Sequence, residues 1–336
     1  MESVVITGMA VLAASGTETA QFWENLQAGR SSLVPLTRVK SDKLTTGVAG
    51  EIRDFDPEAH FGKEGELLDR FAQLGVLGAR RALENAGLGQ RSQDWPYAAE
   101  RVGVLTGTGM GGICSQDHGF RTIYGEGATR VHPFLIPRSM YSAATSQIGM
   151  ATGARGPSFT ISTACASSTH ALGEAWRLLR SGAADMFLAG GSDAPLTFGV
   201  IKAWEAMRVL ATAGEDASRA CRPFSRDRSG LVLAEGAAMF VLETAAGAQR
   251  RGARVLAELA GYGATADAGH ITQPDPAGAG NAMREALRTA GLSPEDVDYI
   301  NAHGTGTKLN DATEIAAIKQ VFGPAAQRLS ISSTKS

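Results

Sequence analysis

Short apolar runs alternate with amphipathic stretches along the whole chain. Runs of strand length lie at 3–13, 101–107, 158–163, 185–191, 238–243, 254–264, 296–304 and 329–334. Between them, apolar residues recur with a helical period at 17–29, 71–87, 199–210, 244–252, 278–290 and 310–322. Apolar strands that alternate with amphipathic helices are typical of a protein with an extensively buried sheet. The pattern therefore predicts an α/β fold.

The chain shows no obvious linker. No low-complexity tract, block of like charge or Ser/Gly/Pro-rich segment divides it. A second series of strands and helices begins near Arg254, so we expect two parts of similar kind, residues 1–253 and 254–336. The most loop-like stretch, 212–230, holds four arginines, and we interpret it as a solvated surface loop.

The composition narrows the class of protein. With 43% hydrophobic and 20% charged residues, the 336-residue chain can bury a large core. A formal net charge of −2 argues against broad electrostatic binding to nucleic acid or an anionic membrane, and no apolar run is long enough to span a bilayer. Cys114, Cys165 and Cys221 form neither a metal-ligand spacing nor a disulfide framework. We therefore expect a cytoplasmic protein without a metal site.

A glycine-rich stretch follows the apolar run 101–107. The segment "GTGMGG" (107–112) satisfies the GxGxxG pattern of dinucleotide-binding proteins. That fingerprint also needs a helix that opens on the glycines and an acidic residue at the end of the next strand. The following sequence, 113–134, does not have the pattern of a strand that ends in an acidic residue. We therefore expect a tight backbone turn that lines a pocket, and no dinucleotide.

Cys165 lies in "TACASS", between a β-branched run at 158–163 and a helical repeat at 172–179. This places the cysteine at or just before the first turn of a helix, where unpaired N–H groups favour a thiolate. Its small neighbours would let a substrate reach the sulfur. A buried structural cysteine is the other interpretation, and the local sequence does not decide between them.

Two further residues with reactive side chains follow apolar strands. His303 lies in "NAHGTGT", followed by a Gly/Thr turn in which Thr305 and Thr307 offer hydroxyls, and Lys335 follows the run 329–334. Strand ends are where α/β proteins place their active sites. Cys, His and Lys delivered by three strand ends fit carbonyl chemistry through a thioester.

These motifs resemble the β-ketoacyl-acyl-carrier-protein synthases. "TACASS", "NAHGTGT" and "SSTKS", together with the segment at 221–243, are similar to the elongating ketosynthase II type, and "LAGGSDAP" resembles its nodulation and aromatic-polyketide branches. The similarity extends over essentially the whole chain. It implies a thiolase-like fold with two βαβαβαββ halves in αβαβα layers, and a homodimer. It also implies decarboxylative Claisen condensation of a cysteine-bound acyl group with malonyl-acyl carrier protein, in fatty-acid, related lipid or polyketide synthesis.

The resemblance also implies roles for single residues. Cys165 carries the acyl group, His303 donates a hydrogen bond to the enolate oxygen, and Lys335 supplies positive charge beside the site. Thr305 and Thr307 match residues that bind the phosphopantetheine arm of the carrier protein, which brings the substrates, so no further cofactor is implied.

Four other positions correspond to the acyl pocket and the carrier-docking surface. Met110 matches the residue that gates the pocket, and Trp204 lies at a position that lines it. Arg208 and Lys63 match basic residues that dock the acidic carrier protein. Glu66 and Leu67 stand where the group often has basic residues, so we expect a weakened or retuned interface.

The chain departs from the family pattern at its C-terminal end. A second catalytic histidine and a Gly-Phe-Gly loop normally follow "SSTKS", but the sequence ends at Ser336. We therefore expect a C-terminally truncated chain with an incomplete second half and little activity of its own. A coenzyme A-dependent thiolase and an inactive ketosynthase-like partner subunit are the alternatives; the histidine and lysine motifs disfavour the first, and Cys165 disfavours the second.

Overall fold

The computed structural model describes residues 2–212, 214 and 216–335, so Ser336, at which we predict a truncation, lies outside the described residues. The chain divides into two compact units, each built from separate segments. Unit 1 contains Met1–Ala28, Glu51–Val200 and Ala234–Leu259, and unit 2 contains Gly29–Gly50, Ile201–Leu233 and Ala260–Ser336. The domain boundary at 253/254 stays a prediction.

Unit 1 alternates strands and helices, as the hydrophobic pattern predicts. Its strands are β1 (Val4–Ala13), β4 (Val102–Gly107), β5 (Ser158–Ile161), β6 (Met186–Asp193), β7 (Gly236–Thr244) and β8 (Ala257–Glu258). Its helices include α1 (Thr19–Gln27), α2 (Pro57–Phe61), α3 (Arg70–Asn85), α4 (Ile113–Phe120), α5 (Leu135–Ser139), α6 (Ala143–Thr152), α7 (Ser167–Arg180) and α9 (Ala245–Arg250). The predicted α/β class is confirmed. The run at 254–264 was expected to be a longer strand, and only β8 forms there.

The strands of unit 1 form one six-stranded mixed sheet in the order β5-β4-β6-β7-β1-β8. Strand β4 pairs in parallel with β5 and β6, whereas β7 pairs antiparallel with β6 and β1. Parallel strands bury both faces, which explains why β4 and β6 read as continuous apolar runs. Their carboxyl ends, Gly107 and Asp193, lie at the same edge of the sheet.

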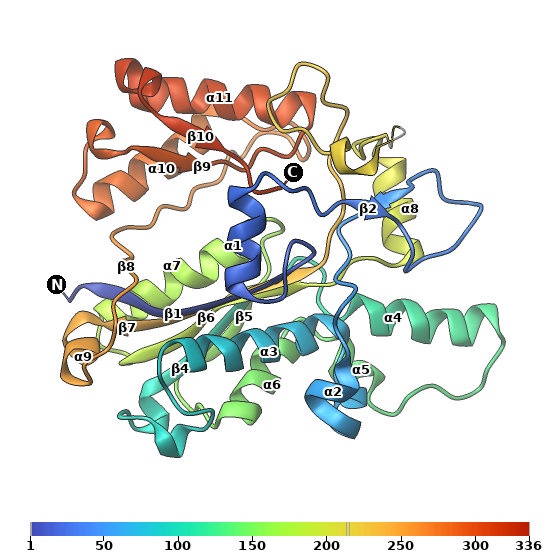
Figure 1. Cartoon of the computed structure of the whole chain (residues 1–336), viewed down its shortest axis with the longest axis horizontal. Coiled ribbons are helices and arrows are strands. Elements are labelled where there is room, and N and C mark those ends of the chain that lie inside the picture. The colour runs from blue at the N-terminus through green and yellow to red at the C-terminus, as the bar shows by residue number, and fades with distance from the viewer. Residues whose placement is uncertain (1, 213, 215, 336) are drawn as a thin grey trace. The chain divides into compact units, whose positions relative to one another are not determined.

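Helices α3 and α7 cover opposite faces of this sheet (Figure 1). Successive residues of β6 point to opposite faces of the sheet. Gly191 packs against Ser168 of α7, whereas the Ser192 hydroxyl faces Gly75 of α3 and would lie 3.0 Å from a Cβ added there. The apolar side of α3 packs on β4, β6 and β7 in a fully buried cluster that includes Leu83 and Met239. The sheet is therefore covered by a helix on each face near the strand ends from which the Cys165 turn and the 107–112 turn emerge.

Unit 2 contains two two-stranded sheets. Strands β2 (Val34–Pro35) and β3 (Val48–Ala49) pair antiparallel, and β9 (Tyr299–Asn301) and β10 (Ser330–Ser332) pair in parallel. Helices α10 (Pro276–Ala290) and α11 (Lys308–Phe322) pack with the second sheet around Phe322, as the sequence pattern predicts. Helix α8 (Phe198–Ala206) begins in unit 1 and ends in unit 2.

The prediction of a solvated loop at 212–230 is wrong for the second half of this stretch. Residues 213 and 215 lie outside the described residues, but Cys221 is buried and the Arg228 guanidinium lies 3.1 Å from the buried carboxylate of Asp311. The backbone N–H of Phe224 donates to the same carboxylate at 2.8 Å. The segment therefore packs against the turn that follows His303, within unit 2.

Candidate active site

Cys165 lies on a tight turn between β5 and α7, two residues before the helix begins at Ser167. The sequence pattern predicts this position. Ala164 has φ of 53°, a left-handed conformation that a residue with a Cβ seldom adopts. The sharp turn presents Cys165 as an exposed free cysteine rather than a core residue. Backbone strain of this kind persists only where neighbouring contacts impose it.

The hydroxyl of Ser167 supplies those contacts. It accepts the backbone N–H of Thr163 at 2.8 Å and lies 2.6 Å from the carbonyl oxygen of Ala164, to which it donates. Its oxygen is also 3.2 Å from the carbonyl of Thr108, which follows β4. Ser167 is 2% exposed, so these bonds are shielded from water. One buried hydroxyl therefore ties the nucleophile turn to the neighbouring strand end.

Glycine residues allow α7 to approach the sheet closely. A Cβ at Gly107 would overlap the backbone of Ser167 and Ser168, and one at Gly191 would overlap the side chain of Ser168. The first turn of α7 consequently sits directly on the ends of β4 and β6. The positive end of the α7 dipole therefore lies next to the Cys165 turn.

The glycine-rich segment after β4 forms a tight turn fastened by Asp193, the last residue of β6. The Asp193 carboxylate accepts the Thr108 hydroxyl at 2.8 Å, the Gly109 N–H at 3.0 Å and the Met110 N–H at 3.0 Å. Helix α4 does follow this turn, but the next strand, β5, ends at Ile161 without an acidic residue. The segment thus lacks the acidic partner of a dinucleotide site, and Met110 is half-buried within the turn.

In unit 2, His303 and Lys335 emerge from neighbouring strands. The parallel pairing places Asn301 of β9 opposite Ser332 of β10, so the residues that follow both strands lie at one edge. The Nζ of Lys335 donates to the carbonyl oxygen of His303 at 2.5 Å. These two candidates, 32 residues apart in the sequence, are therefore in direct contact.

Glu314 of α11 holds the backbone after β9. Its carboxylate accepts the N–H of His303 at 2.6 Å and the N–H of Gly304 at 2.8 Å. Glu314 was not among the candidate residues predicted from the sequence, although an acidic residue in the helix that follows the histidine turn was a usable signal. Asp193 was missed in the same way, as an acidic residue at a strand end.

Thr305 and Thr307 lie side by side in the turn after His303. Their hydroxyl oxygens are 2.9 Å apart, and the Thr307 side chain caps α11 by accepting the N–H of Asn310. Buried Asp311 accepts the Gly306 N–H at 3.2 Å. The turn is thus held by its own helix, and Thr305 is itself buried.

The electrostatic surroundings favour a neutral His303. Burial of the ring lowers the pKa of His303 below its ordinary value, and the positive charge of Lys335 lowers it further. The carboxylates of Glu314 and Asp311 oppose this shift but do not reverse it. A neutral imidazole carries one N–H, which can donate a hydrogen bond to a developing oxyanion.

The remaining predicted residues lie elsewhere in the two units. Trp204 is half-buried in α8, Arg208 is exposed just beyond that helix, and Lys63 is exposed in a 3₁₀ turn of unit 1 that also exposes Glu66 and Leu67. These placements leave their roles as predictions.

The other two cysteines have structural surroundings. Cys114 donates to the carbonyl of Ala194 at 3.2 Å. Burial raises the pKa of the Cys221 thiol, so it remains protonated beside Thr305. Neither has the exposed position of Cys165.

Sequence profiles of one family cover nearly the whole chain. The β-ketoacyl synthase N-terminal domain matches residues 1–248, and the β-ketoacyl synthase C-terminal domain matches residues 256–336. The chain belongs to the β-ketoacyl synthase family. The predicted ketosynthase resemblance, thiolase-like fold and condensing-enzyme class are thereby confirmed.

Individual relatives agree with this assignment. Nodulation protein E of Rhizobium meliloti (strain 1021) is 46% identical over 333 residues, and 3-oxoacyl-[acyl-carrier-protein] synthase 2 of Staphylococcus aureus (strain COL) is 41% identical over 336 residues. In both cases the match covers 99% of this chain and 80% of the relative.

Solved structures resemble this one in fold. A type II polyketide synthase acyl carrier protein has been solved in complex with its ketosynthase bound to the hexaketide, and that structure matches with 32% identity and a TM-score of 0.89. The match covers 99% of this chain and 81% of the solved one.

Within the part of the chain that the structure describes, no group of three His, Cys, Asp or Glu side chains could hold a metal ion. No described helix is long and apolar enough to cross a membrane.

Proposed function

We propose that this chain is a β-ketoacyl-acyl carrier protein synthase that uses Cys165 as its nucleophile and His303 with Lys335 in the condensation step. The observation that carries the proposal is the exposed Cys165 on a strained turn at the start of α7. Family membership supplies the reaction class, and the contact between Lys335 and His303 supports a shared role for those two residues.

The first half-reaction transfers an acyl group. The Cys165 thiolate attacks the acyl thioester carbon, the bond to the carrier thiol breaks, and the acyl group remains on Cys165. The N-terminal end of α7 follows the Cys165 turn directly, and the Cys165 backbone N–H contributes to the oxyanion hole. Buried Ser167 holds the tight turn between β5 and α7, and this turn keeps the Cys165 sulfur exposed to the incoming thioester.

The second half-reaction forms the carbon–carbon bond. Malonyl-acyl carrier protein loses carbon dioxide, and the electron pair left behind makes a thioester enolate. The N–H of neutral His303 donates to the enolate oxygen, while Lys335 fixes the His303 backbone and disfavours protonation of its ring. The enolate carbon then attacks the acyl carbon on Cys165, whose thiolate leaves. The electron pair released from the carboxyl group forms the new carbon–carbon bond, and the Cys165 thiolate keeps the pair of the broken thioester bond, so this step needs no oxidant or reductant.

The substrates would arrive on the phosphopantetheine arm of an acyl carrier protein. Thr305 and Thr307 have adjacent hydroxyls that suit the amides of such an arm, and the half-buried Thr307 is the more accessible of the two. Exposed Lys63 and Arg208 suit an acidic carrier, and exposed Glu66 beside Lys63 would favour a carrier with a less uniformly acidic surface. Met110 and Trp204 are the proposed acyl-pocket residues.

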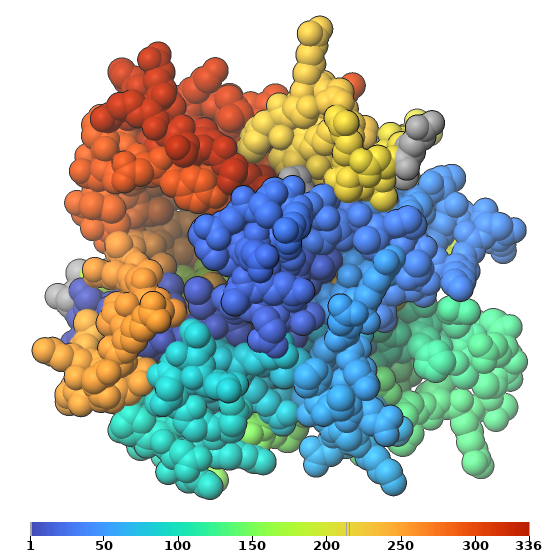
Figure 2. Space-filling model, in the orientation of Figure 1, coloured from blue at the N-terminus to red at the C-terminus, as the bar shows by residue number. Residues whose placement is uncertain are grey.

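We also propose a homodimer formed through β5. This strand is an edge of the six-stranded sheet, and its Phe159 side chain is 44% exposed. Several other large apolar side chains between 120 and 150 are at least half exposed, among them Tyr124, Ile136 and Met150, and part of this green segment is on the face shown in Figure 2. An unpaired edge strand in a unit that also exposes large apolar side chains is suited to pairing with a second copy. Analytical ultracentrifugation should find a dimer that Phe159→Glu dissociates; a monomeric parent chain would refute this assembly.

The test of the nucleophile is intact mass spectrometry after incubation with a medium-chain acyl-carrier protein. We expect one acyl adduct on the parent chain, none on Cys165→Ala, and an unchanged adduct on Cys114→Ala, the matched control. Persistence of the adduct in Cys165→Ala would overturn the assignment. A parallel incubation with acyl-coenzyme A tests the thiolase alternative, because faster loading from the free coenzyme would favour it.

The test of the second half-reaction is decarboxylation of malonyl-acyl carrier protein. We expect His303→Ala and Lys335→Ala to reduce carbon dioxide release while Cys165 still accepts the acyl group. Parent-level carbon dioxide release by both variants would overturn their assigned roles. A folded parent chain that neither loads Cys165 nor releases carbon dioxide would instead support an inactive partner subunit.

A further inference from the structure

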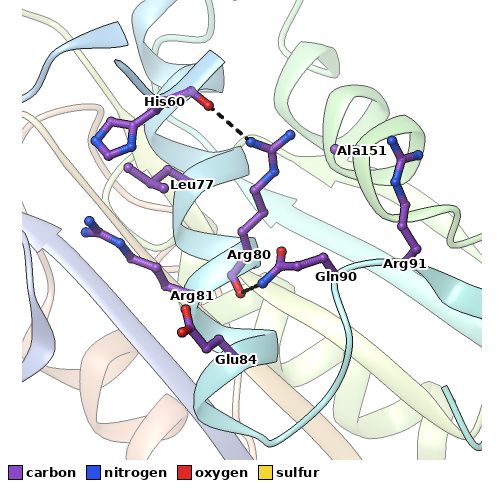
Figure 3. Close-up of a pocket in the computed structure, with 8 residues that line it drawn as sticks. All are labelled: His60, Leu77, Arg80, Arg81, Glu84, Gln90, Arg91 and Ala151. Carbon is purple, nitrogen blue, oxygen red and sulfur yellow. Dashed lines mark hydrogen bonds between the residues drawn. The ribbon is translucent and has the colours of Figure 1, made fainter. Parts of the chain in front are cut away.

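Unit 1 contains a pocket that is separate from every residue proposed above for catalysis or docking. It has a volume of about 380 Å³ and is bordered by the second half of α3, by His60 of α2, by the turn at 90–91 and by Ala151 of α6 (Figure 3). Leu77 and Ala151 give it apolar wall, and the other lining side chains are polar or charged. All of its borders belong to unit 1.

Three arginines and a single acidic residue line this pocket: Arg80, Arg81, Arg91 and Glu84. Arg81 is already neutralised by Glu18, whose carboxylate lies 2.6 Å away. In Figure 3, Arg81 extends to one side of α3, whereas Arg80 and Arg91 both extend toward the side on which Ala151 lies.

Arg80 and Arg91 contact carbonyl oxygens rather than carboxylates. Arg80 donates to the carbonyl of His60 at 3.5 Å and its guanidinium lies 5.3 Å from the centre of the Phe61 ring. Arg91 donates to the carbonyl of Met150 at 3.4 Å. Neither forms an ion pair with any carboxylate among the described residues. Their long contacts orient the guanidinium groups and leave most of the five N–H donors of each available.

Both guanidinium groups border the same pocket without a carboxylate partner among the described side chains, so a bound anion would supply the counter-charge that they lack. A guanidinium group presents a planar fork of donors that matches the oxygens of phosphate or a similar oxyanion. The pocket is concave, has the size of a small-molecule site and combines apolar wall with a few convergent polar groups. A protein partner would more readily use exposed, convex cations such as Lys63.

We propose that this pocket binds a small phosphorylated molecule, with Arg80 and Arg91 as the principal ligands of its phosphate oxygens. Phosphate binding in this pocket is independent of the condensation chemistry, because no residue that lines the pocket has a role in the proposed reaction. Inorganic phosphates and organic phosphate esters both carry the phosphate oxygens that the two arginines would bind. The experiment below distinguishes these two kinds of ligand.

The probe is sodium pyrophosphate, titrated by isothermal calorimetry against the full chain and compared with sodium chloride at equal ionic strength. We expect saturable binding that chloride does not reproduce. Arg91→Gln and Arg80→Gln should each weaken binding at least tenfold, and Arg91→Lys, which keeps the charge but loses the fork, should lie between. Arg284→Gln, on exposed α10, is the matched control and should bind as the parent does. Glycerol 3-phosphate in a parallel arm identifies an organic ester as the preferred source if it binds more tightly than pyrophosphate.

Circular dichroism melting establishes that each variant is folded. If Arg80→Gln unfolds because it loses its contact with Phe61, Arg91→Gln, in an exposed turn, still decides the question. No saturable binding of either probe, or equal binding by the parent and Arg91→Gln, would overturn the proposal. An acidic carrier protein that loses affinity for Arg91→Gln, while neither phosphate probe binds, would identify a protein contact and also overturn it.

Discussion

The backbone N–H of Met110 donates to the carboxylate of Asp193 at 3.0 Å, which joins the turn after β4 to the end of β6. The same carboxylate holds Thr108 and Gly109, so one side chain fixes three consecutive residues. Met110 is the proposed gate of the acyl pocket. Its position is therefore set by a rigid strand end and not by the turn alone.

Replacing Asp193 with asparagine should loosen this turn. The amide of Asp193→Asn keeps one acceptor oxygen but turns an NH₂ group toward N–H donors, which leaves at least one of them unsatisfied. We expect a loss of about 1–3 kcal/mol in the free energy of unfolding and a broader range of acyl chains loaded on Cys165. Chemical denaturation and competition between acyl-carrier substrates of different length measure the two effects. Asp216→Asn, at an exposed 3₁₀ turn, is the control, and an unaltered chain-length profile in Asp193→Asn would separate this carboxylate from the gate.

Glu314 should affect condensation more than acylation. Glu314→Gln removes the charge that accepts the N–H groups of His303 and Gly304, and charge-assisted bonds of this kind contribute about 1.5–3 kcal/mol. Displacement of His303 should lower kcat for condensation at least tenfold while acyl loading of Cys165 stays within about twofold, because loading uses unit 1. Single-turnover loading and steady-state condensation distinguish the two. Glu295→Gln, an exposed carboxylate near β9, is the control; equal losses in both assays would mean a general folding defect.

The regular elements and Cys165 could be predicted from the sequence because their signals are local. Hydrophobic period defines α3 and β6, and a β-branched run followed by a helical repeat places Cys165 at a helix start. Glu314 and Asp193 act through hydrogen bonds to residues that are distant in the sequence or on another strand. No periodic pattern marks such partners. An acidic residue in the next helix or at a strand end makes them candidates, but only the fold shows which N–H groups they accept.

For the stretch 212–230 the sequence led to a wrong prediction rather than to a missed residue. Its four arginines suggested a solvated loop, because charge usually indicates exposure. Arg228 is instead paired with Asp311 and donates to the carbonyl oxygens of Thr307 and Lys308. An arginine can be buried when carboxylate and carbonyl acceptors satisfy it, and those acceptors come from a segment about eighty residues later in the chain.

The lowered pKa of His303 should make stability depend on pH. In the folded protein, burial and then the positive charge of Lys335 disfavour protonation of the His303 ring. In the unfolded chain the same imidazole has its ordinary pKa of about 6.5, so it binds the proton more readily. Stability from this residue is therefore fully present above about pH 6.5 and falls as the pH decreases toward the lower folded-state pKa, by at most about 1.4 kcal/mol per pH unit. Denaturant unfolding between pH 5 and 8 should show this slope, and His303→Asn should be flatter there. Parallel pH profiles for the parent and the variant would contradict the assignment.

Gly107 should tolerate no side chain. A methyl group in Gly107→Ala would overlap the backbone at the start of α7, and backbone cannot rotate aside as a side chain can. Overpacking of this kind costs about 1–3 kcal/mol, and it should also displace the Cys165 turn and slow acyl loading. Gly47→Ala, where the added carbon meets open space, is the control for thermal unfolding. Equal melting temperatures for the two variants would show that α7 can withdraw from the sheet without cost.

The two compact units do not coincide with the two sequence domains of the family. Residues Gly29–Gly50 and Ile201–Leu233 lie within the N-terminal family domain but belong to the unit that contains His303 and Lys335. Cutting the chain near residue 250 would therefore separate both segments from residues 260–336, which belong to the same compact unit. Replacing one family domain with that of a homologue would therefore exchange parts of both compact units at once. Successful chimaeras should instead transplant 29–50 and 201–233 together with the C-terminal segment.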